Sequence, residues 1–455
     1  MPLERVGPSG GSAAPEPGRS PRSLTASTAN RHQQRNECIT MASGFLSEHT
    51  AVLNTLDPGD PVLDDLEPLR GVIEDARVVG IGEGAHFVQE FTLARARLLR
   101  FLVERCGFTH VALELGSAQA SDVNPWLAGD GDESDLHRLS GPLTLGVFGE
   151  LLRWLRRFNV SRPHPVQIVG IDLPNTLTLL PDLDPVADYL KLVDPDVGDL
   201  VADVLRAAGE ITGDSAAVSG PRWGSLDPAF QDALTAGLAR LSTRLSALEP
   251  IYVSRSDQHR YDTARRHLDA ACHTDYMLRA MNDLFSGRGA TGDTSVRDHY
   301  MAAAVQWHLA RAGAGARVVL VAHNNHIQKT PVTFGGYLAA LPMGHYLARD
   351  LGRQYRAVAL THTAGQVPEM SVTAEGSPVG FTVGLVTLDA PPPGSVERAL
   401  AEAGLGRVVT LTDLRSRTSL DRIRSQSAFV NTPLHQAFDA VMSAPTATTD
   451  PTVNF

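Results

Sequence analysis

The feature that most constrains the fold is a pattern repeated along the middle of the chain. A short run rich in β-branched residues stops abruptly at a glycine or a polar residue, and a longer stretch with helical spacing follows. The runs are Arg77–Ile81, Thr109–Leu113, Val166–Ile171, Arg317–Val321 and Tyr355–Leu360. Continuous apolar runs of this kind are typical of strands buried on both faces. The sequence therefore predicts an α/β protein with a mostly parallel central sheet flanked by helices.

Other segments depart from this alternation. Apolar residues at helical spacing predict a helix over residues 90–105, which Gly107 would end. From residue 181 to residue 288 the strand signal fades and long helical patterns replace it, so we expect a helical insertion or cap there. Two late strands are expected, over residues 381–388 and 407–411.

The two ends of the chain differ in composition from the middle. Residues 1–40 are rich in Pro, Gly, Ser and Arg and have few large apolar side chains, which predicts a disordered extension. Met41 could be the native start. Residues 443–455 are predicted to form a loose C-terminal tail. The α/β core would then comprise residues 41–180 and 289–442.

Composition excludes several classes of partner. The formal net charge of −11 is spread along the chain, which argues against binding to nucleic acid. No stretch approaches the roughly 18 apolar residues that a membrane span needs, and no apolar run near the N-terminus resembles a secretory signal. We therefore expect a cytoplasmic protein that acts on a small molecule. The sequence leaves the oligomeric state open.

Ionisable residues follow four of the predicted strands. They are Glu83 and His86 after the first run, Glu114 after the second, Asp172 after the third, and His323 and His326 after the fourth. In open parallel sheets, ligands bind beyond the carboxyl ends of the strands. Each residue alone would more often be a helix cap, a surface charge or a structural histidine. Together they predict one shared site, because burying several ionisable groups is costly unless they are paired or functional.

Two further residues near the first strand have open interpretations. Glu90 lies four residues after His86 and could either orient the imidazole or solvate the first helical turn. Arg95 could hold an anionic or carbonyl group, or it could be an ordinary surface arginine. The histidines and carboxylates could also assemble a divalent metal site, although no spacing requires one. We expect no cofactor, with a divalent metal as the alternative.

A different interpretation of the first turn is a dinucleotide-binding oxidoreductase. Residues 80–85 fit the Gly-x-Gly-x-x-Ala fingerprint after a strand, and Glu114 ends the next strand, where a ribose-binding acid would lie. However, Glu83 would place a negative charge beside the pyrophosphate. The histidines after the fourth strand would also have no role.

With these residues identified, the chain resembles the erythromycin esterase family. The matching stretches are Arg77–Phe91, Gly107–Gly116, Arg297–Val305, Ala322–Ile327 and Pro342–Leu347. The resemblance implies a mixed α/β core with a helical portion. It also implies hydrolysis of a carboxylic ester, such as that of a macrolide lactone.

The resemblance assigns roles to the candidate residues. His86 would be the general base that activates water, and Glu83 would hold and polarise it. Arg95, His323 and Glu114 match further positions regarded as functional. The candidates for substrate contacts are His326, Glu90, Asp172, Arg297 and Phe87. Phe87 stands where many members have glycine, so we expect it to affect the shape of the pocket.

Histidine suits this reaction because its ordinary pKa lies near neutrality. An arginine or a second histidine could stabilise the developing oxyanion. The same site could instead serve a natural-product tailoring enzyme that eliminates, cyclises or rearranges its substrate, since a site is fixed more firmly than a substrate.

Overall fold

An eight-stranded sheet runs through the part of the chain that the computed structural model describes, which is residues 44–453 without 161, 335–336 and 373–379. The expectation for residues 1–40 lies outside these residues. In spatial order the strands are β1 (Thr50–Val52), β11 (Thr410–Asp413), β14 (Ala440–Ala444), β8 (Tyr355–His362), β2 (Val78–Ile81), β5 (Val318–Val321), β3 (His110–Gly116) and β4 (Gln167–Asp172).

Most neighbouring strands of this sheet run parallel. The consecutive pairs from β14 to β4 are parallel, and only β1 and β11 join in antiparallel pairs at one edge. The predicted α/β class with a mostly parallel central sheet is confirmed. The five runs found in the sequence correspond to β2, β3, β4, β5 and β8.

Helices cover both faces of the sheet because side chains along each strand alternate between the faces. In β2, Val79 and Ile81 join one core, while Val78 joins the other. The first core is covered by α2 (Glu67–Ile73), α3 (Gln89–Cys106), α4 (Ser117–Ser121), α5 (Asn124–Ala128) and α6 (Asp135–Asn159). The second is covered by α13 (Ser295–Arg311), α14 (Asn324–Ile327), α15 (Met343–Leu351), α16 (Val396–Glu402) and α17 (Leu434–Ala437).

Gly107 ends α3 in the left-handed conformation, with φ 73°, and its backbone N–H donates to the carbonyl of Leu102. This is the stop that the sequence predicts, because glycine adopts positive φ without steric cost. Short 3-10 helices also occur. They are η1 (Asp64–Leu66), η2 (Pro195–Val197) and η3 (Gly352–Gln354).

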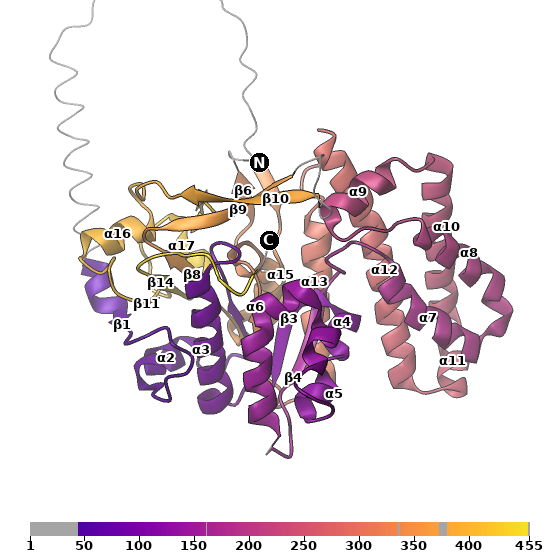
Figure 1. The fold of residues 1–455 in the computed structure, drawn as a ribbon, viewed down its shortest axis with the longest axis horizontal. Helices are drawn as coiled ribbons and strands as arrows, with labels where there is room; N and C mark the ends of the chain where they lie inside the picture. Colours follow the sequence, from indigo (N-terminus) through magenta and orange to yellow (C-terminus); the bar gives the residue numbers. More distant parts are fainter. Residues whose placement is uncertain (1–43, 161, 335–336, 373–379, 454–455) are drawn as a thin grey trace, which may run out of the picture.

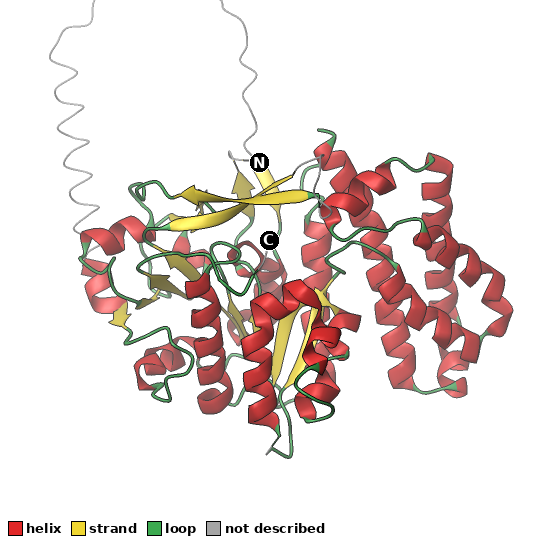
Figure 2. Cartoon of the chain, in the orientation of Figure 1, coloured by secondary structure: helices red, strands yellow, loops and turns green. Residues whose placement is uncertain are grey.

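A separate helical lobe lies beside the sheet, on the right in Figures 1 and 2. It consists of α7 (Leu180–Val193), α8 (Gly198–Gly209), α9 (Ala216–Gly224), α10 (Pro228–Ala247), α11 (Glu249–Arg255) and α12 (Gln258–Phe285). These helices share their own apolar core, which Tyr300 of α13 also joins. The lobe therefore contacts the sheet domain through α13.

Three two-stranded antiparallel sheets lie outside the main sheet among the described residues. They are β6 (Val332–Phe334) with β7 (Tyr337–Ala340), β9 (Gln366–Val372) with β10 (Phe381–Thr387), and β12 (Arg422–Ser425) with β13 (Ala428–Asn431). The late strand expected over residues 381–388 is β10. It pairs with β9 outside the main sheet.

A loose tail is expected for residues 443–455, but residues 443–453, which the structure describes, do not form one. Ser443 and Ala444 belong to β14, between β11 and β8 in the sheet. The following residues pack against the loop before α3: Gln89 N donates to Thr448 O at 2.9 Å, and Asp450 N donates to Phe87 O at 2.8 Å. Asp450 is buried. This segment therefore stabilises the loop that carries His86.

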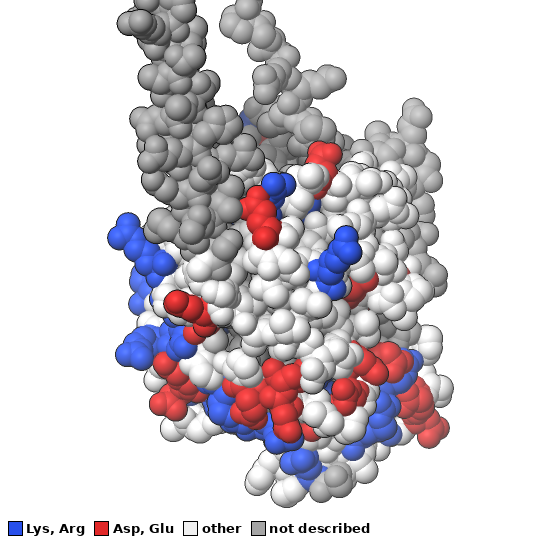
Figure 3. Space-filling model, turned by 90° about the vertical axis from the view of Figure 1, so that its left-hand side faces the viewer, with Lys and Arg blue, Asp and Glu red and all other residues white. Residues whose placement is uncertain are grey.

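No helix among the described residues is long and apolar enough to cross a membrane. On the face shown in Figure 3, basic and acidic side chains are interspersed over the lower part, so that face has no continuous basic patch.

Candidate active site

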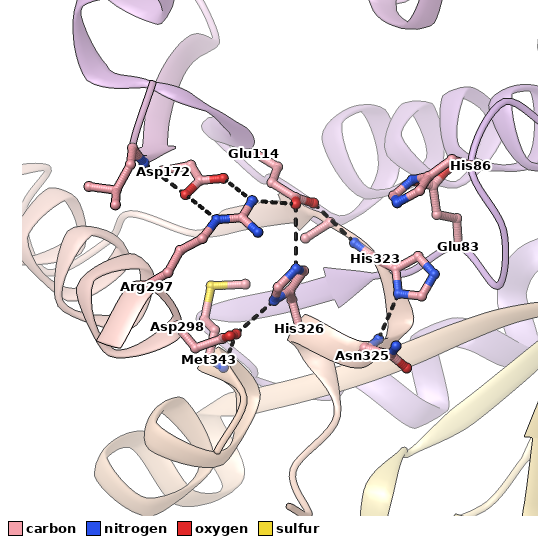
Figure 4. A network of polar contacts seen from close by, with 12 residues as sticks. Glu83, His86, Glu114, Asp172, Arg297, Asp298, His323, Asn325, His326 and Met343 are labelled. Carbon is pink, nitrogen blue, oxygen red and sulfur yellow. Dashed lines mark hydrogen bonds and ion pairs between the residues drawn. The ribbon is translucent and has the colours of Figure 1, made fainter. Parts of the chain in front are cut away.

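The carboxyl ends of four adjacent parallel strands form the centre of the site. These strands are β2, β5, β3 and β4, in that spatial order. Glu83 and His86 follow β2, and His323 follows β5. Glu114 lies near the end of β3, where its pairing with β4 shifts register, and Asp172 is the last residue of β4. The sequence candidates at the strand ends therefore lie along one edge (Figure 4).

Glu83 holds His86 through the ring nitrogen Nδ1. Its Oε1 lies 2.7 Å from His86 Nδ1, and its Oε2 lies 2.7 Å from Arg95 Nη1. Both Glu83 and Arg95 are buried. Because Nδ1 is bound to the carboxylate, Nε2 on the other side of the ring is available to the cavity that His86 lines.

Arg95, on α3, fixes the position of Glu83 and thereby of the Glu83–His86 pair. Besides pairing with Glu83, it donates from Nε to Gly82 O and from Nη2 to Ala322 O, each at 3.0 Å. It thereby ties the loop after β2 to the loop after β5. Arg95 is buried and does not line the cavity, so it is not a surface arginine, and its contacts position Glu83.

The surroundings of the Glu83–His86 pair keep Glu83 ionised and raise the pKa of His86. Burial tends to lower the pKa of His86, but the hydrogen bond and charge of Glu83 outweigh burial and raise it. Burial tends to raise the pKa of Glu83, whereas Arg95 and His86 hold it below its usual value. Glu83 therefore remains ionised and stabilises the protonated form of His86.

His323 lies beside His86, with 4.9 Å between the ring centroids, but it is in a different state. Its Nδ1 accepts from the backbone N–H of Asn325 at 3.1 Å, so the neutral ring carries its proton on Nε2. Burial and the neighbouring His86 lower the pKa of His323 to about 3. Its Nε2 is buried without a partner among the described residues. His323 is therefore a neutral donor adjacent to the Glu83–His86 pair.

A chain of charges lies on the other side of the site (Figure 4). Arg297 donates from Nε to Asp172 Oδ1 and from Nη2 to Glu114 Oε1, each at 2.9 Å. His326 Nδ1 lies 2.7 Å from Asp298 Oδ1. Burial opposes charge on these groups, yet His326 and Arg297 hold the pKa of Glu114 at about 2. Burial also opposes the charged form of His326, but Asp298 and Glu114 raise its pKa to about 9.

A cavity of about 780 Å³ opens onto these residues. Its polar end is formed by His86, Asp172, Arg297, Asp298, His323 and His326. Its opposite wall is apolar and comes mainly from α12, through Met277, Ala280, Met281 and Leu284. Further lining residues come from the segment after β4, from Ala216 of α9, from the loop after α12, and from Glu369 and Met370 of β9. A mostly apolar cavity with a few converging polar groups is typical of a small-molecule site.

Five of the ten candidates do not line the cavity: Glu83 and Glu114, which contact residues that do line it, Arg95, which contacts Glu83, and Glu90 and Phe87. Glu90 accepts from the backbone N–H of Thr448 at 2.8 Å and from its hydroxyl at 2.9 Å, so it anchors the C-terminal segment instead of orienting His86. Phe87 has a left-handed φ of 61° and does not line the cavity. Its carbonyl accepts from the backbone N–H of Asp450 at 2.8 Å.

Two residues of the site were missed by sequence reasoning. Asp298 follows Arg297 at the start of α13, in a stretch that carried the resemblance, but nothing in the sequence indicates that it faces His326. Gln426, in the turn between β12 and β13, accepts from the backbone N–H of His86 through Oε1 at 2.7 Å. No sequence signal connects a residue 340 positions away to His86.

The glycines of the first turn have a packing role that involves no nucleotide. A Cβ atom at Gly82 would lie 1.9 Å from Asn324 Oδ1, and one at Gly84 would lie 2.9 Å from Leu360 O. In addition, α3 begins only at Gln89, so the turn does not lead directly into a helix N-terminus as a phosphate-binding turn does. The fingerprint in residues 80–85 is therefore explained by close contacts with β8 and α14.

Among the residues that the structure describes, no group of three or more His, Cys, Asp or Glu side chains is arranged to hold a metal ion. The carboxylates that follow the strands are already engaged: Glu83 with His86 and Arg95, and Glu114 with Arg297.

Comparisons with known proteins identify the family. The family model "Erythromycin esterase" matches residues 103–447. Erythromycin esterase type I from Escherichia coli is 41% identical over 397 residues, which cover 87% of this chain and 97% of that protein. Erythromycin esterase type II from Escherichia coli is 34% identical, covering 85% and 93%.

Solved structures give the same result. A mutant of the erythromycin esterase EreC in its open conformation superimposes with a TM-score of 0.85 and 38% identity, covering 89% of this chain and 100% of that one. A succinoglycan biosynthesis protein has a TM-score of 0.67 at 21% identity, covering 91% and 97%, and shares the fold. Because both the family model and these relatives extend over most of its length, the chain belongs to the erythromycin esterase family and is an ester hydrolase.

Proposed function

We propose that this protein hydrolyses the ester bond of a macrolide-type lactone or a related natural-product ester, with His86 as the general base that activates water. The observation that carries the proposal is the Glu83–His86 pair, 2.7 Å apart, at the polar end of a large and mostly apolar cavity. Two relatives from Escherichia coli are named erythromycin esterases, which supports a macrolide substrate.

The reaction begins when His86 Nε2 accepts a proton from a water molecule while that water attacks the ester carbonyl. A base in this position contributes about 10²–10⁴-fold to the rate. Glu83 stabilises the imidazolium that forms, since its carboxylate is bound to Nδ1. No covalent nucleophile from the protein is needed.

His323 stabilises the negative charge that develops on the carbonyl oxygen. Its Nε2–H is buried next to His86 and has no partner in the part of the chain that the structure describes, and its pKa of about 3 keeps the ring neutral. A neutral donor fixed in this way does not compete with His86 for the water proton. One such donor stabilises a transition state by about 2.7–4 kcal/mol in enzymes where it has been removed.

The proposal is tested by incubating the protein with erythromycin and measuring the mass of the product. We expect a gain of one water, and a fall in rate of about 10²–10⁴-fold for His86→Ala. Loss of one water would indicate elimination, the reaction of a tailoring enzyme, and would contradict hydrolysis.

A His86→Ala variant with the unfolding temperature of the wild type and full turnover would also contradict the proposal. Repeating the assay with a chelator tests for a metal. We expect no change in rate, because Glu83 and Glu114 are held by Arg95 and Arg297.

A further inference from the structure

A second histidine–carboxylate pair lies at the cavity, opposite the Glu83–His86 pair. His326 Nδ1 is bound to Asp298 Oδ1 at 2.7 Å, and the same oxygen accepts from the backbone N–H of Met343 at 2.8 Å. Asp298 is buried, so its orientation is fixed by α13 and α15. Both His326 and Asp298 line the cavity. The mechanism above leaves this pair without a role.

Ester cleavage needs a proton at the leaving oxygen as well as a base for the water. A single imidazole held by a carboxylate can serve both oxygens in turn, as in the Ser-His-Asp triad. A separate acid lets the leaving oxygen take a proton while His86, held by Glu83 at Nδ1 and by Gln426 at its backbone N–H, still carries the proton of the water. The second pair at the cavity offers such an acid.

We propose that His326 is the general acid of the reaction, with Asp298 as its positioning residue. This inference rests on the ester hydrolysis proposed above. The water oxygen bonds to the carbonyl carbon as its proton passes to His86 Nε2. When the tetrahedral intermediate collapses, the bond from carbon to the leaving oxygen breaks, and that oxygen takes the proton from His326 Nε2. His86 then releases a proton to solvent and His326 regains one.

The surroundings of His326 favour the protonated form that an acid requires. Burial and Arg297 lower its pKa, but Asp298 and Glu114 outweigh them and raise the pKa to about 9. His326 is thus a cation at neutral pH. Its proton on Nε2 faces Glu114 Oε1 across 3.5 Å, longer than an ordinary hydrogen bond.

Glu114 does not depend on His326 for its other contacts. It also accepts from Arg297 at 2.9 Å and from the backbone N–H of His323 at 3.2 Å. His326 can therefore turn its proton toward a substrate oxygen without leaving Glu114 unpaired. Figure 4 shows Glu114 between the two histidine pairs.

The test compares two esters of one acyl group, an alkyl ester and a nitrophenyl ester. An alkoxide needs a proton to leave, whereas a nitrophenolate does not. For His326→Gln we expect kcat/KM on the alkyl ester to fall by about 10²–10⁴-fold and on the nitrophenyl ester by less than about tenfold. Asp298→Asn should show the same preference to a smaller degree.

His299→Gln is the matched control, since His299 follows Asp298 on α13 but is exposed and makes an edge-to-face contact with Tyr346. It should leave the ratio of the two rates unchanged. Activity on the nitrophenyl ester also shows that each variant is folded. Equal losses on both esters, or no loss on either, would overturn the proposal for His326.

A second measurement uses the pH profile of kcat/KM on the alkyl ester. In the wild type the rate should decline on the alkaline side as His326 loses its proton, and this decline should be absent in His326→Gln. A decline that persists in the variant would overturn the proposal. If the wild type hydrolyses neither ester nor erythromycin, the proposed function itself fails, which is a different result from failure of the acid role.

Discussion

Three histidines of one site differ because their partners differ. His86 and His326 each hold a carboxylate at Nδ1, at 2.7 Å in both cases. His323 instead accepts a backbone N–H at Nδ1. A carboxylate raises the pKa of an imidazole and a backbone donor does not, so the first two can carry charge and the third stays neutral. In the mechanism proposed above, one residue type thus supplies a base, an acid and a neutral donor.

The pH dependence of the reaction follows from the Glu83–His86 pair. As a base, His86 works only in its neutral form, so kcat/KM should fall as the pH drops through its pKa, which Glu83 raises above 6.5. In Glu83→Gln, burial and Arg95 still lower this pKa, and of the groups that raise it only the charge of Glu114 remains among the main causes. The acid limb of the profile should therefore move to lower pH, and the maximum rate should fall.

Glu90→Gln is the control for this measurement, because Glu90 is close to His86 in sequence but binds Thr448. Its acid limb should match that of the wild type. An acid limb in Glu83→Gln that stays in place, or moves to higher pH, would show that Glu83 does not set the pKa of the base.

At the scale of elements, the strands that could be predicted from the sequence are those that helices cover on both faces, because such strands need apolar residues throughout. β2, β5 and β8 are fully buried and appear as β-branched runs. β1 has three residues and is partly exposed, so it has no such run. β14 consists of Ala, Val, Met, Ser and Ala, so it contains one β-branched residue and no such run. Its place between β11 and β8 depends on long-range pairing, which local composition does not encode.

The turn after β2 offers a test of close packing between elements. A methyl group at Gly82 would overlap Asn324, whose side chain donates to Leu360 O at 2.8 Å and thereby joins α14 to β8. Gly82→Ala should therefore lower the free energy of unfolding by about 1–3 kcal/mol and reduce activity, because Asn324 must move. Chemical denaturation and the ester assay measure the two effects.

Gly71→Ala is the matched control, since Gly71 lies inside α2 with no atom within 4 Å of the added Cβ. There the substitution should raise the free energy of unfolding by about 0.5–1 kcal/mol, because alanine loses less backbone entropy in a helix. If Gly82→Ala were as stable and active as Gly71→Ala, the loop after β2 would not require a glycine.

At the scale of the whole molecule, the strand-end argument predicted the polar half of the site but not its apolar half. Parallel strands bring their carboxyl ends together, so residues after β2 to β5 could be placed from the sequence alone. The facing wall comes from α12, and whether a helical insertion covers a site depends on how its own core docks on α13. Asp298 and Gln426 were missed because their contacts with His326 and His86 also depend on the packing of segments that are far apart in the sequence.

The position of the helical lobe should set the size of the substrate. Ala216, at the start of α9, lines the cavity and is partly exposed, so a larger side chain there has room to occupy the space opposite His86. Ala216→Phe should raise KM for erythromycin by about tenfold, equivalent to about 1.4 kcal/mol of lost binding, and leave kcat/KM for a small nitrophenyl ester almost unchanged. Ala236→Phe, on the exposed side of α10 in the same lobe, should change neither. A loss of activity on both substrates in Ala216→Phe would mean that the lobe supports the catalytic groups themselves, whereas no change on either would mean that substrate does not reach this wall.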